Sequence, residues 1–595
     1  HQRAAERYRK DDALLYKKDS GWKRISSESW LTRARHLALG LHALGLRRGD
    51  RVALLSENRH EWFLVDGALQ ILGAPNVPIY STLTPRQVAY ILRNSEARAV
   101  IVSDATQQKK LVEFRRDVPS LEHVVTLDAA TEIEGTPLEA VEAAGAKAAA
   151  AEPDLARRLA SAVLPSDLAS IVYTSGTTGD PKGVMLTHQN LVSNVKASLQ
   201  VLPLGENDAA LSALPYCHVF ERMVAHYLYP AAGVSIAIAP SIDTVVENLG
   251  EIRPTVMTMV PRFYEKMYAK VKESAAAGSL LKRKIFAWAI RVGGEHGAYR
   301  SRGEKAPLGL ELRYKIATAL VFKKLHHRLG GRLRFFVSGS APLSKEIAEF
   351  FWAAGIKILE GYGLTETSPV IAVNQPGRVR LGTVGQVIPG VEVEIAADGE
   401  ILARGPNVMK GYYKNEGATR EAIDARGFLH TGDIGVLDRE GFLTITDRKK
   451  DIIVTAGGKN VAPQAIEGKL KTNAYIAEVV VVGNRRSFPS ALIVPNFEKL
   501  IVWCREQEIP TESRDAMTEH PRVRAFIMEQ VERVNTEFAQ YERVKKVALL
   551  PKDFTIESGE LTPTMKTRRS AIESRYEHLI DELYGGPLKG EQKPA

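Results

Sequence analysis

Short apolar runs alternate with longer segments of helical period over the first hundred residues, and this alternation limits the fold more than any other feature. The apolar runs predict strands at Val52 to Leu55, Val77 to Tyr80 and Ala99 to Val102. The segments around them predict helices at Ser27 to Leu44, near Trp62 to Leu72 and from Pro85. Such alternation is typical of an α/β fold in which helices cover β-sheets.

A second α/β unit is predicted near the C-terminus. The strand Phe442 to Ile445 follows a turn and is itself followed by a polar run that begins at Asp447. We place a domain boundary there, which gives a large N-terminal domain of helix-covered sheets (1–446) and a smaller C-terminal domain (447–595). Elements predicted in the smaller domain are strands Val479 to Val482 and Ala491 to Val494 and a helix from Pro521 to Phe538. Residues Leu138 to Asp154 are Ala-rich and predict a solvent-exposed helix or linker.

The sequence predicts a cytoplasmic protein that does not span a membrane. No apolar stretch approaches the roughly 18 residues that a transmembrane helix needs, and the first residues lack the apolar core of a signal peptide. Cys217 and Cys504 are the two cysteines, too few for a disulfide framework.

Positive charge is concentrated in one segment. Between Arg262 and Arg334 there are 18 Lys and Arg against 5 Glu, an excess of 13 that exceeds the net charge of +10 of the whole chain. Apolar residues recur there at helical spacing, which predicts basic amphipathic helices. These helices could present a solvated face, or could dock peripherally on the anionic inner face of a membrane. No nucleic-acid-binding motif accompanies the charge, so we predict no nucleic acid partner.

The strongest chemical signal is the segment IVYTSGTTGDPKGVMLTH at residues 171–188. An apolar, β-branched run feeds a loop of hydroxyl side chains, glycines and one lysine, Lys182, which suits the wrapping of phosphate oxygens. It is not a Walker A loop, because Lys182 is followed by Gly183 rather than Ser or Thr. A flexible polar turn would not need this combination, so we predict a phosphate loop.

This loop resembles the phosphate signature of the acyl- and aryl-CoA synthetase superfamily, which includes luciferases and the adenylation domains of nonribosomal peptide synthetases. Further motifs of that family follow in order, from about residue 20 to 575. They are SGSAP (338–342), GYGLTET (361–367), HTGDIG (430–435), DRKKDIIVTAGGKN (447–460) and GELTPTMK (559–566). The resemblance implies an ATP- and Mg²⁺-dependent, AMP-forming ligase whose smaller domain is mobile.

The resemblance also implies which residues bind the nucleotide. Tyr362 would stack on adenine, Asp433 would accept hydrogen bonds from the ribose hydroxyls, and Glu366 with Thr174 would meet Mg²⁺. The implied nucleotide-binding residues are Thr174, Ser175, Gly176, Thr177, Thr178, Gly179, Lys182, Gly339, Ser340, Ala341, Glu360, Gly361, Tyr362, Gly363, Thr365, Asp433 and Arg448.

The resemblance further implies that four residues take part in catalysis: Lys566, Glu366, Thr174 and Lys182. Lys566 would bridge the carboxylate and the α-phosphate during adenylation, and would leave when the smaller domain turns about a hinge at Lys450. Gly457 and Gly458 would then border the path of CoA.

Three segments resemble the long-chain fatty acyl-CoA synthetases: 214–222, 333–340 and the basic insertion after residue 264. They imply an acyl pocket bordered by His218, Val219, Phe220 and Gly339, although His218 alone could equally be structural. The implied substrates are a long-chain fatty acid, ATP and CoA, and soluble relatives make a homodimer plausible. Two alternatives remain: a ligase that passes the acyl group to a carrier protein, and a non-catalytic fatty-acid-binding or transport protein.

Overall fold

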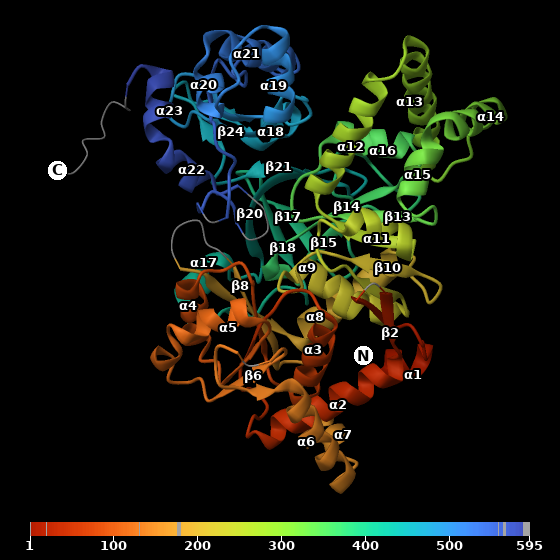
Figure 1. Ribbon diagram of the computed structural model, residues 1–595, viewed down its shortest axis with the longest axis vertical. Coiled ribbons are helices and arrows are strands. Elements are labelled where there is room, and N and C mark those ends of the chain that lie inside the picture. Colours follow the sequence, from red (N-terminus) through yellow and green to blue (C-terminus); the bar gives the residue numbers. More distant parts are fainter. Residues whose placement is uncertain are drawn as a thin grey trace.

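The computed structural model describes residues 2–19, 21–129, 131–174, 180–556, 558–562 and 567–586 (Figure 1). Its first sheet has the strand order β16-β15-β14-β13-β12-β10-β11-β1-β2. In that order the strands are Gln386–Val387, Val370–Val373, Ile358–Gly363, Phe335–Ser338, Val256–Met259, Ala209–Ser212, Ser235–Ile238, Leu14–Lys18 and Gly21–Ile25.

The second sheet has the order β19-β9-β8-β4-β3-β5-β6-β7. Its strands, in that order, are Gly411–Tyr412, Lys182–Thr187, Leu168–Thr174, Asn76–Ile79, Val52–Leu55, Ala99–Val102, His123–Thr126 and Thr136–Pro137. Strand β3 pairs in parallel with β4 and β5, and all its residues are buried. A short apolar run is the pattern expected of a parallel strand covered on both faces.

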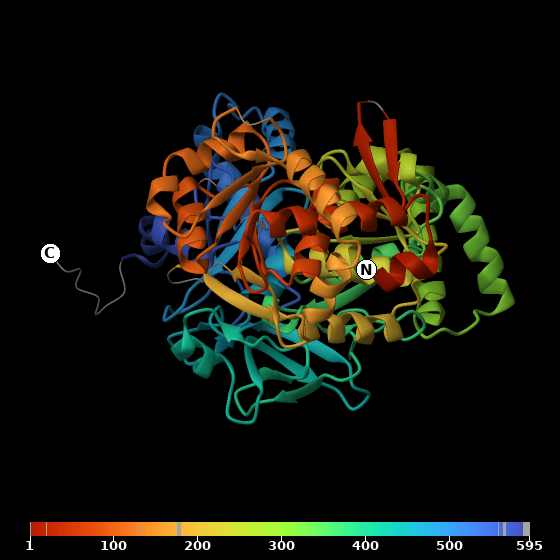
Figure 2. The same ribbon diagram turned by 90° about the horizontal axis from the view of Figure 1, so that it is seen from below.

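A third, antiparallel sheet forms a separate lobe beside the other two (Figure 2). Its strands, in spatial order, are β17 (Glu392–Ile395), β18 (Glu400–Arg404), β20 (Leu429–Leu437) and β21 (Leu443–Arg448). Beyond it, the C-terminal unit contains β24 (Ile476–Val482), β25 (Ser490–Pro495) and β26 (Lys546–Leu549), with a small hairpin of β22 (Ile453–Val454) and β23 (Asn460–Val461).

Helices surround the first two sheets and fill the C-terminal unit (Figure 1). Those before the third sheet are α1 (Gln2–Tyr8), α2 (Ser27–Ala43), α3 (His60–Leu72), α4 (Pro85–Ser95), α5 (Ala105–Val112), α6 (Leu138–Ala151), α7 (Leu155–Ala162), α8 (His188–Val201), α9 (Val219–Glu221), α10 (Tyr229–Ala232), α11 (Val245–Ile252), α12 (Pro261–Ala276), α13 (Leu280–Ser301), α14 (Leu308–Ala317), α15 (Lys323–Arg328) and α16 (Lys345–Ala353). Helix α17 (Glu416–Ala422) follows, and the C-terminal unit has α18 (Pro463–Leu470), α19 (Phe497–Glu506), α20 (Arg514–Glu519), α21 (Pro521–Asn535), α22 (Arg569–Arg575) and α23 (Glu577–Tyr584).

The predicted α/β class is confirmed, and the predicted elements of the first hundred residues lie within two residues of the observed ones. The N-terminal part and the C-terminal unit have separate hydrophobic cores among the described residues. The strand predicted at Phe442 to Ile445 begins at Leu443 and continues to Arg448, so it runs past the predicted boundary at residue 446. No described helix is both long enough and apolar enough to cross a bilayer.

The Ala-rich segment contains a helix, one of the two predicted alternatives, and most residues of that helix are exposed or partly exposed; Leu138, Val141 and Gly145 are buried. Helix α6 lies against α2, and two glycines allow the backbones to touch. A Cβ added at Gly145 would lie 1.7 Å from the carbonyl oxygen of His36, and one at Gly40 would lie 1.9 Å from that of Val141. The sequence did not indicate this close contact, because small side chains suit close helix packing as well as exposure.

We expect Gly145→Ala to destabilise the protein by about 1–3 kcal/mol, because the added methyl group must push α6 away from α2. Gly294→Ala is the matched control: Gly294 is also helical and has open space around it, so the change should be neutral or stabilise by up to about 1 kcal/mol. Urea unfolding of both variants measures the difference. Equal stability of the two variants would contradict the packing described here.

Candidate active site

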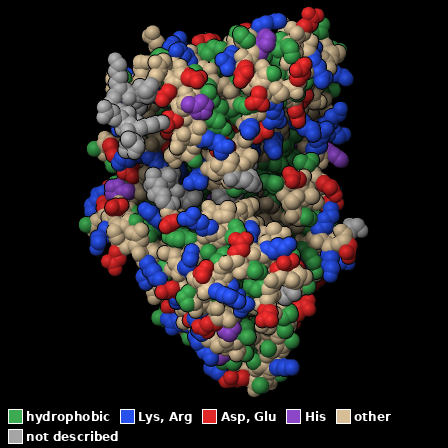
Figure 3. Space-filling view, turned by 60° about the vertical axis from the view of Figure 1, so that its left-hand side comes forward, with side chains coloured by type: hydrophobic (Ala, Val, Ile, Leu, Met, Phe, Trp, Pro, Cys, Tyr) green, Lys and Arg blue, Asp and Glu red, His purple; other side chains and the backbone are tan. Residues whose placement is uncertain are grey.

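One cavity of about 1580 Å³ lies where the sheets of the N-terminal part meet the C-terminal unit. The space-filling view shows a hollow between the upper and lower parts of the molecule (Figure 3). Strands β8, β14, β20 and β21 contribute to its wall from one side, while Gln464, Lys469 and Phe538 contribute from the C-terminal unit. A cavity larger than typical single-ligand pockets, with walls from both parts, can hold more than one substrate.

The residues predicted to bind adenine and ribose meet in one corner of this cavity. The Tyr362 hydroxyl donates to Asp433 Oδ2 at 2.7 Å, and Arg448 Nε lies 3.4 Å from Asp433 Oδ1. Asp433 and Arg448 are paired across β20 and β21. Burial raises the pKa of Tyr362 well above its usual value, so its hydroxyl stays protonated and donates.

The phosphate side is built on the hairpin of β8 and β9, where Thr174 is paired with Lys182. Lys182 Nζ lies 5.1 Å from the ring centre of Tyr412, and the Tyr412 hydroxyl donates to Glu366 Oε1 at 2.9 Å. Tyr412 thus links the predicted lysine with the predicted metal ligand. Five predicted loop residues and the lysine predicted to be catalytic lie outside the described residues: Ser175, Gly176, Thr177, Thr178, Gly179 and Lys566.

Tyr412 is a site residue that the sequence motifs did not indicate. It lies outside every quoted motif, and a tyrosine alone predicts nothing about catalysis. The sequence offers no signal for it, because the pairing of β19 with the phosphate hairpin strand β9, which places Tyr412 in the site, is visible in the structure alone.

The residues present fit a Mg²⁺ ion held mainly by a nucleotide. The Glu366 carboxylate and the Thr174 hydroxyl both line the cavity, and both offer hard oxygen atoms. No cluster of three or more His, Cys, Asp or Glu that could hold a metal occurs in the described part of the chain. Mg²⁺ commonly needs only one or two carboxylates when substrate phosphates complete its coordination.

The predicted acyl residues border an apolar part of the same cavity. Among its walls are Leu202, Leu204, Met223, Val224, Leu228 and Phe335. Phe220 packs over Gly339, where a Cβ would lie 3.1 Å from the ring. Nδ1 of His218 accepts a hydrogen bond from the Phe220 N–H at 3.3 Å. His218 therefore caps the short helix that carries Val219 and Phe220, besides lining the cavity itself.

The other predicted nucleotide-binding residues lie just after β13, within β14 or just after β14, and each lines the cavity: Gly339, Ser340, Ala341, Glu360, Gly361, Gly363 and Thr365. Ser340 has φ +71°, a left-handed conformation that non-glycine residues seldom adopt. Such local strain is often found at functional sites.

Glu360 is the most unusual carboxyl group in the cavity wall. Its side chain is buried, and its Oε1 has no hydrogen-bond partner among the described residues. Burial raises the pKa of Glu360 to about 8, so the group is largely protonated at neutral pH. A neutral acid can line an acyl or purine pocket without repelling an anionic substrate.

The residue predicted as the hinge lines the cavity, whereas the two glycines predicted to border the CoA path do not. Lys450 is the second residue after β21 and lines the cavity, and burial beside Arg448 lowers its pKa. Gly457 and Gly458 lie in the exposed turn between β22 and β23, and they are not part of the cavity wall in this arrangement.

Ion pairs at the surface join the C-terminal unit to α12 and α16. Arg262 pairs with Glu478 at 2.9 Å, and Lys469 pairs with Glu346 at 3.1 Å. Lys499 pairs with Glu273 in the same region. The sequence did not indicate these contacts, because partners more than a hundred residues apart leave no local pattern.

Comparison with known proteins places this geometry in a family. A family model described as AMP-binding enzyme matches residues 1–413, and one described as AMP-binding enzyme C-terminal domain matches residues 450–587. The chain is 37% identical to long-chain-fatty-acid–CoA ligase FadD15 of Mycobacterium tuberculosis, over 96% of this chain and 94% of that protein. It is 32% identical to the peroxisomal long chain acyl-CoA synthetase 7 of Arabidopsis thaliana, over 94% and 82%.

Solved structures share the fold at lower identity. The anthranilate CoA ligase AuaEII in complex with anthranoyl-AMP matches with a TM-score of 0.74 and 22% identity, over 97% of both chains. ATP-bound MatB from Rhodopseudomonas palustris matches with a TM-score of 0.69 and 24% identity, over 96% of this chain and 97% of that one.

We expect Glu360→Gln to make the protein more stable than the wild type at pH 8, and nearly equal in stability at pH 5. The folded-state pKa of Glu360 is raised above the ordinary value of 4.5, so the wild type loses stability as pH rises from about 4.5 to 8. Glutamine mimics the protonated acid and carries no such penalty. The difference at pH 8 should be on the order of a few kcal/mol.

Urea unfolding at the two pH values measures this difference. Glu349→Gln is the control, because Glu349 also lines the cavity but its side chain is exposed. A Glu360→Gln effect that is the same at both pH values would contradict the buried, protonated state.

Proposed function

We propose a reaction for this chain from the family to which it belongs, the AMP-binding enzymes. The protein is an AMP-forming ligase that converts a long-chain fatty acid, ATP and CoA to acyl-CoA, AMP and pyrophosphate through an acyl adenylate. The observation that carries the proposal is that one cavity joins an apolar branch beside Phe220 to the polar corner at Asp433. The names of the relatives, aligned over nearly the whole chain, agree with the long-chain substrate.

The first half-reaction brings two anions together. The fatty acid carboxylate must approach the α-phosphate of ATP, and negative charge grows on that phosphate in the transition state. Lys182 contributes positive charge, while Asp433 and Tyr362 hold the nucleoside. Mg²⁺, when bound at Glu366 and Thr174, shields the phosphate oxygens. Lys566 completes the site in this proposal by contacting both the carboxylate and the α-phosphate.

The second half-reaction needs the CoA thiol at the same acyl carbon. We assign Lys450 as the hinge about which the C-terminal domain turns. The boundary predicted between residues 446 and 447 falls inside β21, which ends at Arg448, so the turning part begins after that strand. Gly457 and Gly458 then border the pantetheine arm, since a backbone without side chains allows close approach. One site can serve both steps because domain rotation exchanges the groups that face the substrate.

The relatives do not favour the two alternatives that the sequence left open. A ligase that serves a carrier protein would release no AMP in response to CoA, and a binding protein would release none at all. A non-catalytic protein would be expected to have lost Lys182, Glu366 or Asp433. All three are present here, and they line the cavity. A cytoplasmic location and a homodimer stay predictions.

The central test is pyrophosphate release with ATP and Mg²⁺ across saturated acids from acetate to stearate, with and without CoA. We expect CoA-stimulated turnover that is greatest for long chains, since each buried CH₂ adds about 0.8 kcal/mol of binding. Lys566→Ala should lower turnover by at least about a hundredfold. Turnover that peaks on short or aromatic acids would overturn the substrate, and turnover without CoA dependence would favour transfer to a carrier.

Tyr412→Phe tests the link between the lysine and the metal ligand. Loss of the hydroxyl removes a hydrogen bond that orients Glu366, and we expect pyrophosphate release to fall up to about tenfold, with a raised Mg²⁺ requirement. The neighbouring Tyr413→Phe is the control, because its hydroxyl donates to Glu96, away from the cavity. Equal rates for the two variants would show that Tyr412 does not act through Glu366.

A further inference from the structure

Helix α14 and the turn that follows it are apolar on two opposite sides. The inner side packs on the protein through Ala317 and Phe322, which are buried. The outer side carries an apolar row of Leu308, Leu312, Ile316 and Leu320, which are 90, 62, 46 and 61% exposed. A surface helix of a globular protein normally has a single apolar face, so the outer row calls for a partner.

The local backbone keeps this row in line. Each four-residue step along a regular α-helix turns the side chain by about 40°, so a row of this spacing drifts around the helix. A π-helical stretch at Thr318–Phe322 has more residues per turn, and this opposes the drift between Ile316 and Leu320. The four side chains of the apolar row therefore form one continuous surface.

Basic side chains flank the apolar row. Residues 280–328 contain 12 Lys and Arg against 3 Glu. Each of the three Glu is already paired, with Arg313, Arg302 and His296. Lys315, Lys323 and Lys324 are exposed and, among the described residues, have no carboxylate within ion-pair distance. Their positive charge is thus available to an external partner.

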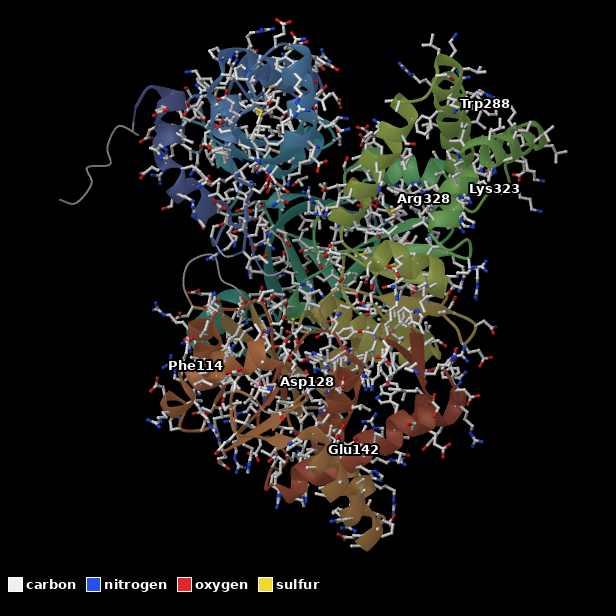
Figure 4. All side chains as sticks on the ribbon, in the orientation of Figure 1. Phe114, Asp128, Glu142, Trp288, Lys323 and Arg328 are labelled. Carbon is white, nitrogen blue, oxygen red and sulfur yellow. The ribbon has the colours of Figure 1, made fainter. Side chains whose placement is uncertain are left out.

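The apolar row lies on a lobe at the outer edge of the molecule. Figures 1 and 2 both place α13 and α14 there, and Figure 4 locates Trp288, Lys323 and Arg328 on the same lobe. Leu280 and Leu281, at the start of α13, are also exposed and are followed by the basic run Lys282 to Lys284. A projecting surface can reach a flat partner without a clash from the rest of the protein.

We propose that the apolar row and its flanking lysines dock this protein on the surface of an anionic lipid bilayer. The four apolar side chains enter the boundary between headgroups and acyl chains, while the lysines contact lipid phosphates. No transmembrane segment is needed. The free energy of such binding has two contributions: burial of the apolar row, and attraction between the lysines and the lipid phosphates.

Charge decides between a bilayer and other partners. A second copy of this chain docked face to face would bring two basic lobes together, which costs energy through like-charge repulsion. A nucleic acid would use the lysines but would leave the four apolar side chains unexplained. An anionic bilayer uses both features, and the proposal does not depend on the ligase reaction.

The test is sedimentation of the full-length protein with vesicles of phosphatidylcholine, with and without phosphatidylglycerol. We expect binding only to the anionic vesicles, weakened by high salt because the charge contribution is screened. Ligase activity is assayed in parallel on a soluble acid, so that loss of vesicle binding and loss of catalysis are separate results.

Two triple variants divide the apolar from the charge contribution. Leu308→Gln with Leu312→Gln and Leu320→Gln should raise the lipid concentration for half-binding at least about tenfold. Lys315→Gln with Lys323→Gln and Lys324→Gln should do so as well, and should remove most of the salt dependence. The controls change exposed residues elsewhere: Val112, Leu164 and Val246 to Gln, and Lys147, Lys196 and Lys552 to Gln.

Three outcomes would overturn the proposal. Wild-type protein that stays in solution with anionic vesicles at low salt has no such surface. Leucine variants that bind vesicles as the wild type does would show that the row is not inserted. A wild-type dimer that the leucine variant dissociates, without vesicle binding by either, would identify the row as an interface between copies.

Discussion

The carboxylate of Asp433 connects three parts of the chain. It lies on β20 of the third sheet, accepts a hydrogen bond from Tyr362 at the end of β14 in the first sheet, and faces Arg448 at the end of β21. A buried carboxylate is stable only with such partners, so the third sheet must sit where both can reach it. Because the chain enters the C-terminal unit just after Arg448, the same contact also fixes where that unit begins.

Much of this arrangement could be predicted from sequence because the signals were local. The strand Val52–Leu55 is an uninterrupted apolar run between turn residues, and its bounds were predicted correctly. The residues predicted to bind the nucleotide came from motifs that resemble those of a known family, and the described ones line one cavity; their binding of nucleotide stays a prediction. Tyr362 and Asp433, taken from two separate motifs, indeed form a hydrogen bond.

The features that sequence could not supply depend on contacts between distant segments. A role for Tyr412 can be inferred only from the structure, in which β19 places it between Lys182 and Glu366. The protonated state of Glu360 depends on burial, which no motif encodes. The close contact of the Ala-rich helix with α2 was not predicted, because exposure and close helix packing favour the same small side chains. The basic segment was recognised, but the outward direction of Leu308 and Leu312 required the structure.

The separate cores of the two parts have a consequence for how they move. No described apolar cluster spans the junction, and the joining contacts around α12 and α16 are ion pairs with partly exposed side chains, such as Lys469 with Glu346. Exposed pairs contribute at most about 1 kcal/mol each and are weakened by salt. If the C-terminal unit turns as proposed, it can leave α12 and α16 without exposing either core, and added salt should favour the detached position.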